Sequence, residues 1–278
     1  MIEIQGPALS GKTHLLYHIL LAFLAFEPDP DAQIAAVVYD TDASFDIQRF
    51  RRLLLSRISR RPAVLDPLDS LRRSLSRLHV FRPTSLAQLA TSIANLPAYH
   101  ASRMPNQEIA LLAVDSISAF YWPDRLAAEQ LRTAGILPLH DVLDAIQSVR
   151  RSHGPLSFLT NWALNAAPSH SGSPYTQHLH PFPILQDAIA DLGAKSADHS
   201  SSSPFRLAHH IALSSPSAGS SPPALLGNTL VDTGRHGREI IDNSQVSCLL
   251  RSSGTREAAR FTIQITDDDI LVQPQQVL

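Results

Sequence analysis

The chain of 278 residues has no excess of positive charge. It carries 23 Lys and Arg against 25 Asp and Glu, which gives a net charge of −2 and a pI near 6.7. Nonspecific binding to nucleic acid is driven by an excess of basic side chains, so the composition excludes a protein that binds nucleic acid along its whole surface. Any such contact must come from a local patch or from a partner.

Cysteine and long apolar runs are also scarce. Cys248 is the only cysteine, so the chain cannot form an internal disulfide and fits a reducing compartment such as the cytosol or nucleus. The apolar stretch Leu15–Phe26 is too short to span a bilayer, and it contains Tyr17 and His18. We therefore expect a buried helix there and no contact with a membrane.

The composition is that of a globular protein with irregular segments. Hydrophobic residues make up 44% and charged residues 17%, but there are also 20 prolines. We expect one domain over 1–278, with a disordered insertion at about 165–203 that is rich in Ser, His and Pro, and a looser stretch at about 214–223. Because the chain opens almost directly with the apolar run Ile2–Ile4, we expect no N-terminal domain.

Short apolar runs alternate with amphipathic segments along the first part of the chain. Buried strands are predicted at Ile2–Ile4, Ala35–Asp40, Leu78–Phe81, Ile109–Asp115 and Leu156–Thr160. Helices are predicted at Lys12–Phe26, Asp46–Ser59, Ser85–Asn95 and Leu139–His153. This alternation indicates a mostly parallel sheet with helical crossovers. Near the end, Gln245–Arg251 and Arg260–Thr266 flank a turn and predict an antiparallel hairpin that closes the sheet.

One motif carries a definite chemistry, because it fits the phosphate-loop spacing G-x-x-x-x-G-K-[ST] between a predicted strand and a predicted helix. It consists of Gly6, Pro7, Ala8, Leu9, Ser10, Gly11, Lys12 and Thr13. Its glycines let backbone N–H groups and the helix N-terminus face phosphates. Lys12 brings a positive charge to the terminal phosphates, and the Thr13 hydroxyl can bind Mg²⁺. The chain has only one other lysine, Lys195. The motif predicts binding of ATP, or a close relative, with Mg²⁺.

Two carboxylates follow at the ends of predicted strands, where ligand sites of open α/β sheets gather. Asp115 ends an apolar strand and is predicted to hold the water shell of Mg²⁺ beside Thr13. Asp42 follows the strand that ends at Asp40, and it is a candidate to orient an attacking water. The alternative for Asp42 is a turn residue or N-cap of the helix that begins near Asp46.

Taken together, the motifs resemble the RecA-type recombinases, specifically their eukaryotic paralogues. The likeness is carried by Gly11–His18, Tyr39–Asp46 and Asp115–Arg125, the last of which contains Phe-Tyr-Trp followed by Asp-Arg. It covers roughly Ile2–Asn161 clearly and Phe205–Leu271 weakly. The resemblance implies a RecA-like P-loop ATPase core, which is a mostly parallel central sheet with helices on both faces.

The resemblance also implies a role. It suggests an ATP-binding accessory subunit for double-strand break repair by homologous recombination, acting in the nucleus within a heteromeric complex of other recombinase paralogues. DNA contact is implied through two loops, here about Tyr121–Gly135 and Ala163–Ser203. Neither loop is basic, so we expect weak direct affinity and DNA contact mainly through the assembly.

Two departures from the active recombinases bear on hydrolysis. Those enzymes carry Glu where this chain has Asp42, and the carboxylate that is one methylene shorter sits farther from an attacking water. They also carry Gln after the Asn at the end of the fifth strand, whereas Asn161 is followed here by Trp162. We therefore expect weak hydrolysis or none.

Other interpretations remain open from the residues. The chain could be a competent DNA-dependent ATPase, with Asp42 among its catalytic groups, or a small-molecule kinase on a phosphate-loop scaffold. Six arginines on and just after the second predicted helix form either a DNA-facing patch or a solvated helix face; they are Arg49, Arg51, Arg52, Arg57, Arg60 and Arg61. The aromatic run Phe120–Trp122 either stacks on a ligand or packs beside the Asp115 strand.

Overall fold

In the computed structural model, nine strands form one sheet in the order β11-β10-β9-β8-β1-β5-β4-β2-β3. The structure describes residues 1–25, 33–62, 65–121, 123, 126, 138–162, 164–165, 174–175, 207–214, 244–255 and 258–275. The strands of the sheet are β1 (Ile2–Gly6), β2 (Ile34–Asp40), β3 (Leu78–Phe81), β4 (Glu108–Asp115), β5 (Leu156–Trp162), β8 (His209–Leu213), β9 (Ser244–Ser252), β10 (Ala258–Ile265) and β11 (Ile270–Pro274). A separate two-stranded pair joins β6 (Leu164–Asn165) to β7 (Pro174–Tyr175).

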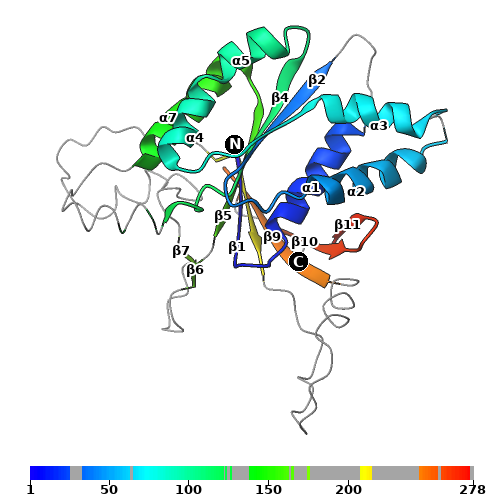
Figure 1. The fold of residues 1–278 in the computed structure, drawn as a ribbon. Coiled ribbons are helices and arrows are strands. Elements are labelled where there is room, and N and C mark those ends of the chain that lie inside the picture. The colour runs from blue at the N-terminus through cyan, green and yellow to red at the C-terminus, as the bar shows by residue number, and fades with distance from the viewer. Residues whose placement is uncertain are drawn as a thin grey trace, which may run out of the picture.

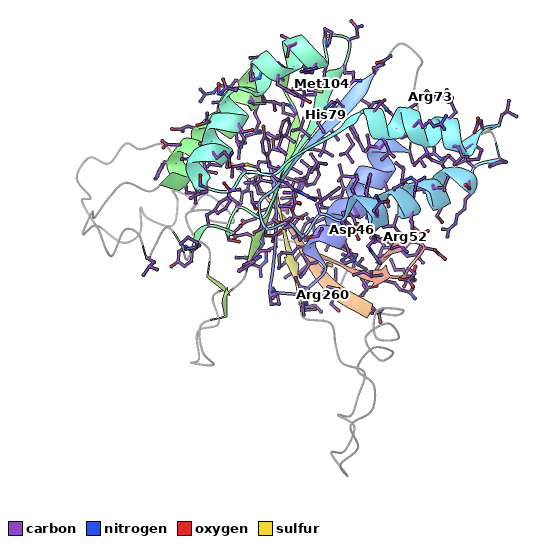
Figure 2. All side chains as sticks on the ribbon, viewed as in Figure 1. Asp46, Arg52, Arg73, His79, Met104 and Arg260 are labelled. Atoms are coloured by element: carbon purple, nitrogen blue, oxygen red, sulfur yellow. The ribbon has the colours of Figure 1, made fainter. Side chains whose placement is uncertain are left out.

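Helices cover both faces of the sheet (Figure 1). They are α1 (Lys12–Leu24), α2 (Ile47–Ser59), α3 (Pro67–Ser76), α4 (Leu86–Ala94), α5 (Leu96–Arg103) and α7 (Pro138–His153). One core lies between the sheet and α1, α2 and α3, and a second core lies between the sheet and α4, α5 and α7. Side chains fill both layers (Figure 2).

The alternation of side chains along β2 shows how one strand serves two cores. Ala36 and Val38 are buried in the core of α1, while Val37 and Tyr39 are buried in the core of α4 and α7. Successive side chains of a strand point to opposite faces, so a strand covered on both faces is apolar throughout. This explains why the central strands appear in the sequence as unbroken apolar runs.

The predicted class of fold is confirmed. The strands β8, β1, β5, β4, β2 and β3 pair in parallel, whereas β8, β9, β10 and β11 pair antiparallel. The five predicted central strands are all present, and β5 extends two residues beyond the prediction. The four predicted helices are present as α1, α2, α4 and α7, with Asp46 and Ser85 acting as N-caps of α2 and α4.

The prediction for the end of the sheet was incomplete. The predicted hairpin corresponds to β9 and β10, but β8 lies between it and the parallel strands, and β11 adds a further strand beyond it. Two helices, α3 and α5, were also missed. The N-terminus of α3 carried a signal, because Asp66 caps it and Pro67 occupies its first turn.

Four of the six arginines at 49–61 bind the chain itself. Arg57 and Arg60 pair with Asp269 in the turn before β11, and Arg49 donates to the carbonyl oxygen of Thr266 at 3.0 Å. Arg61 donates to the carbonyl oxygen of Ala25, and the two that remain on the exposed face of α2 are Arg51 and Arg52. These contacts fix α2 to the C-terminal strands, so the six arginines do not form one patch.

Several predictions fall outside the described residues. These are nearly all of the expected insertion at 165–203, the looser stretch at 214–223 and most of the two expected DNA-contacting loops. Within the described part of the chain, no helix has the length and apolar character needed to cross a membrane.

Candidate nucleotide-binding site

The phosphate loop links β1 to α1 and depends on two glycines. A Cβ atom on Gly6 would lie 2.3 Å from the Ser10 hydroxyl oxygen and 3.1 Å from Cβ of Leu213. Gly11 has φ +84°, and a Cβ there would lie 3.1 Å from Ile265. A side chain at Gly11 would therefore be strained in its backbone and crowded against β10. The glycines of the motif are thus required by the local packing as well as by its proposed ligand.

Lys12 reaches back across the loop. Its ammonium donates to the carbonyl oxygens of Gly6 at 3.0 Å and Pro7 at 2.7 Å. Burial lowers the pKa of Lys12, although the charges of Asp115 and Asp42 oppose that shift. The side chain is only 8% exposed, so its charge is held at the centre of the loop.

A cavity of about 350 Å³ opens beside the loop. Its lining contains most of the predicted site residues together with six that were not predicted as site residues. The lining consists of Ala8, Leu9, Ser10, Gly11, Lys12, Thr13, His14, Tyr17, Asp42, Ser44, Asp46, Arg49, Asp115 and Trp162. Of the predicted residues, Gly6 and Pro7 lie outside the lining, where they support the loop. One cavity thus brings together residues from the phosphate loop, α1, the turn after β2, α2, β4 and β5.

Asp115 ends β4 at the floor of this cavity and is 1% exposed. The Thr160 hydroxyl donates to one of its carboxylate oxygens, and the Ser44 hydroxyl donates to the other at 3.5 Å. Burial raises the pKa of Asp115 to about 6, and hydrogen bonds from Thr160 and Thr13 oppose that rise. A buried carboxylate among hydroxyl groups suits a hard cation such as Mg²⁺.

The turn after β2 is held by its own side chains. The carboxylate of Asp40 accepts from the backbone N–H of Phe45 at 3.2 Å and from Nε of Arg82 at 2.9 Å. Asp42 accepts from the backbone N–H of Ser44 at 3.1 Å. The N-cap alternative for Asp42 is wrong, because Asp46 caps α2. Asp42 is a turn residue that also lines the cavity.

The last two residues of β5 differ in role: Trp162 lines the cavity, and Asn161 forms a buried polar pair with Glu3. The backbone N–H of Trp162 donates to the Ser118 hydroxyl at 2.9 Å, which places its half-buried side chain in the lining. Asn161 donates from its amide to Oε1 of Glu3 at 2.8 Å. Burial raises the pKa of Glu3 to about 7, and the bond from Asn161 opposes that rise. No sequence motif pointed to this pair.

The geometry fits a nucleotide with its magnesium ion in several respects. The buried Ser10 hydroxyl has no hydrogen-bond partner in the part of the chain that the structure describes. Lys12 supplies a buried cation beside it, while Thr13 and Asp115 supply a hydroxyl and a carboxylate. Phosphate needs hydrogen-bond donors and positive charge, and Mg²⁺ needs oxygen ligands, so both kinds of group are at hand.

Comparison with known proteins agrees with this architecture. No protein-family model matches the chain. The DNA repair protein XRCC2 of Mus musculus is 28% identical to it over 181 residues, which are 65% of this chain and 62% of the mouse protein. This likeness agrees with the resemblance of the motifs to the eukaryotic paralogues of the RecA-type recombinases. The chain thus spans somewhat less than two thirds of the length of this relative.

Five of the six unpredicted lining residues lie near predicted ones along the chain. His14 and Tyr17 follow the phosphate loop within the first turns of α1, and Asp46 and Arg49 occupy the first turn of α2. Helical spacing from Thr13 could have found Tyr17, which lies four residues further along α1. Ser44 carried no such signal, because its place depends on the turn after β2.

Proposed function

We propose that the chain binds ATP with Mg²⁺ and acts as an accessory subunit in the repair of DNA double-strand breaks by homologous recombination. The observation that carries this proposal is the convergence of Lys12, Thr13 and Asp115 on one cavity beside a phosphate loop. The likeness to a DNA repair protein supports the biological role.

Each of these residues has a distinct part in the proposal. The Lys12 side chain already reaches across the loop, and it would turn from the carbonyl oxygens of Gly6 and Pro7 toward terminal phosphates. Thr13 and Asp115 would hold Mg²⁺, which neutralises phosphate charge. Backbone N–H groups of the loop would complete the phosphate contacts.

We further propose that turnover is weak. Asp42 is the candidate for orienting an attacking water, but one of its carboxylate oxygens is engaged by the Ser44 N–H. Trp162 occupies the position at which the active recombinases carry Gln. The Trp side chain has one N–H that can donate a hydrogen bond, whereas the Gln side-chain amide both donates and accepts. These features favour retention of nucleotide over hydrolysis, because small displacements of a catalytic group reduce rates strongly.

The proposed setting is the nucleus, within a heteromeric complex of recombinase paralogues. Nucleotide stabilises such an assembly only if it binds the assembled state more tightly than the free chain. DNA contact is proposed to come through the assembly, because the chain has a net charge of −2 and four of the six arginines at 49–61 bind the chain itself.

ATP turnover tests the proposal against its rival, a competent DNA-dependent ATPase, which the place of Asp42 in the cavity favours. Phosphate release would be measured for the wild type and Lys12→Ala, alone, with single-stranded DNA, and with a recombinase paralogue partner. We expect release near background in every sample. Release that DNA stimulates and that Lys12→Ala abolishes would establish the rival.

A further inference from the structure

The Ser44 hydroxyl lies between the two residues proposed to hold magnesium. Its oxygen is 3.2 Å from Oγ1 of Thr13 and 3.5 Å from Oδ2 of Asp115. Thr13 begins α1, Ser44 lies in the turn after β2, and Asp115 ends β4. Three segments far apart in the sequence thus bring three oxygen-bearing groups to one side of the cavity.

The turn that carries Ser44 is held without help from its hydroxyl. The backbone N–H of Ser44 donates to Asp42, and Asp40 fixes the next residue, Phe45, through its N–H. Arg82 braces both Asp40 and the carbonyl oxygen of Phe45. Since these contacts involve the backbone or other side chains, loss of the Ser44 hydroxyl leaves the turn in place.

The contacts of the Ser44 hydroxyl therefore point into the site. Mg²⁺ takes oxygen ligands in octahedral geometry and usually keeps several waters, so a fixed hydroxyl beside a threonine and an aspartate can hold one of those waters or bind directly. A metal ligand is oriented well when the residues that hold it are themselves fixed, and the turn after β2 fixes the backbone of Ser44.

We propose that Ser44 is a further positioning residue of the magnesium site, acting with Thr13 and Asp115. This inference rests on the proposed binding of ATP with Mg²⁺. Its consequence is specific: the Ser44 hydroxyl contributes to the part of nucleotide affinity that depends on Mg²⁺, and it does not contribute to affinity in the absence of the ion.

The test is equilibrium binding of a fluorescent ATP analogue, with Mg²⁺ and with EDTA, to the purified full chain. The variants are Ser44→Ala, which removes the hydroxyl, and Ser44→Thr, which restores it. Ser152→Ala is the matched control, because its hydroxyl bonds only to neighbouring groups of the C-terminal turn of α7. Thermal unfolding of each variant checks that the fold is unchanged.

We expect Ser44→Ala to bind roughly two- to tenfold more weakly with Mg²⁺, the range of one hydrogen bond, and like the wild type in EDTA. Ser44→Ala should also need a higher Mg²⁺ concentration than the wild type to reach half of its Mg²⁺-dependent gain in affinity. Ser44→Thr and Ser152→Ala should bind like the wild type under both conditions.

Two results would overturn the role of Ser44 while leaving the proposed function intact. One is unchanged Mg²⁺-dependent affinity in Ser44→Ala, and the other is an equal loss with and without Mg²⁺, which would indicate a structural role. A wild-type chain that binds no nucleotide under either condition would instead overturn the proposed function, and the role of Ser44 with it.

Discussion

The phosphate loop and the turn after β2 face the same cavity but are built in different ways. The loop is shaped by its glycines and by the backbone, with Gly6 and Gly11 packed where side chains do not fit. The turn is shaped by carboxylates that accept from its backbone, chiefly Asp40 and Asp42. The phosphate loop is specified by a contiguous sequence motif. The turn after β2 depends instead on contacts with distant residues, such as the contact of Asp40 with Arg82, which follows β3.

The largest expected effect concerns Glu3, which lies on β1 three residues before the loop. Its carboxylate is buried, and Oε2 has no hydrogen-bond partner in the described part of the chain. The pKa of Glu3 is about 7 in the fold, against an ordinary value of 4.5. Below pH 4.5 the group is protonated in both states, and stability is unaffected.

As the pH rises from 4.5 to about 7, the unfolded chain releases this proton first, so the free energy of unfolding falls. The full loss is on the order of 3 kcal/mol and is constant above that range. Denaturant unfolding of the wild type and Glu3→Gln at several pH values measures it. The variant should lack this component, while the similar but smaller contribution of Asp115 remains in both proteins. Parallel pH profiles would contradict the assignment.

A smaller effect on the free energy of unfolding is expected from a substitution that loosens the turn after β2. Asp40→Ala leaves the N–H of Phe45 buried without its acceptor, and it removes the partner of Arg82. We expect a loss of about 2 kcal/mol in the free energy of unfolding. The control is Asp69→Ala, which breaks an exposed pair with Arg73 on α3 and should cost less than about 1 kcal/mol. Equal losses would show that the turn is not held by the Asp40 carboxylate.

The smallest expected effect on the free energy of unfolding tests the packing of the phosphate loop against β10. Gly11 and Gly254 both have φ +84°, but a Cβ at Gly11 meets Ile265 at 3.1 Å, whereas a Cβ at Gly254 meets nothing within 4 Å. Alanine at either position carries the strain of a left-handed backbone. The two variants should therefore differ in unfolding free energy by about 1 kcal/mol, with Gly11→Ala the less stable. Identical stabilities would mean that β10 yields to the added methyl group.

Much of the fold was readable because its signals are local. Apolar runs predicted the central strands, and the phosphate-loop spacing predicted Lys12 and Thr13 at the head of α1. The strand β8 was missed because it is a short segment between irregular stretches, with no alternation to mark it. The strand β11 was missed for a related reason, since its five residues follow three successive aspartates.

The candidate site was readable only in part. Asp115 was found because it ends an apolar strand, and Asp42 because it follows another. Ser44 joins the site only through distances to Thr13 and Asp115, residues of other segments. The buried pair of Glu3 and Asn161 likewise depends on the pairing of β1 with β5, which no motif records.

Calorimetric binding of ATP with Mg²⁺ to the purified chain tests the central claim most directly. Lys12→Ala removes the buried cation of the loop, and Arg52→Ala, on the exposed face of α2, is the control for loss of one positive charge. We expect the wild type and Arg52→Ala to bind ATP with equal affinity, and Lys12→Ala to bind at least about tenfold more weakly, as expected for loss of a charged contact. Equal binding by all three proteins, or binding by none, would contradict the assignment of this cavity to a nucleotide.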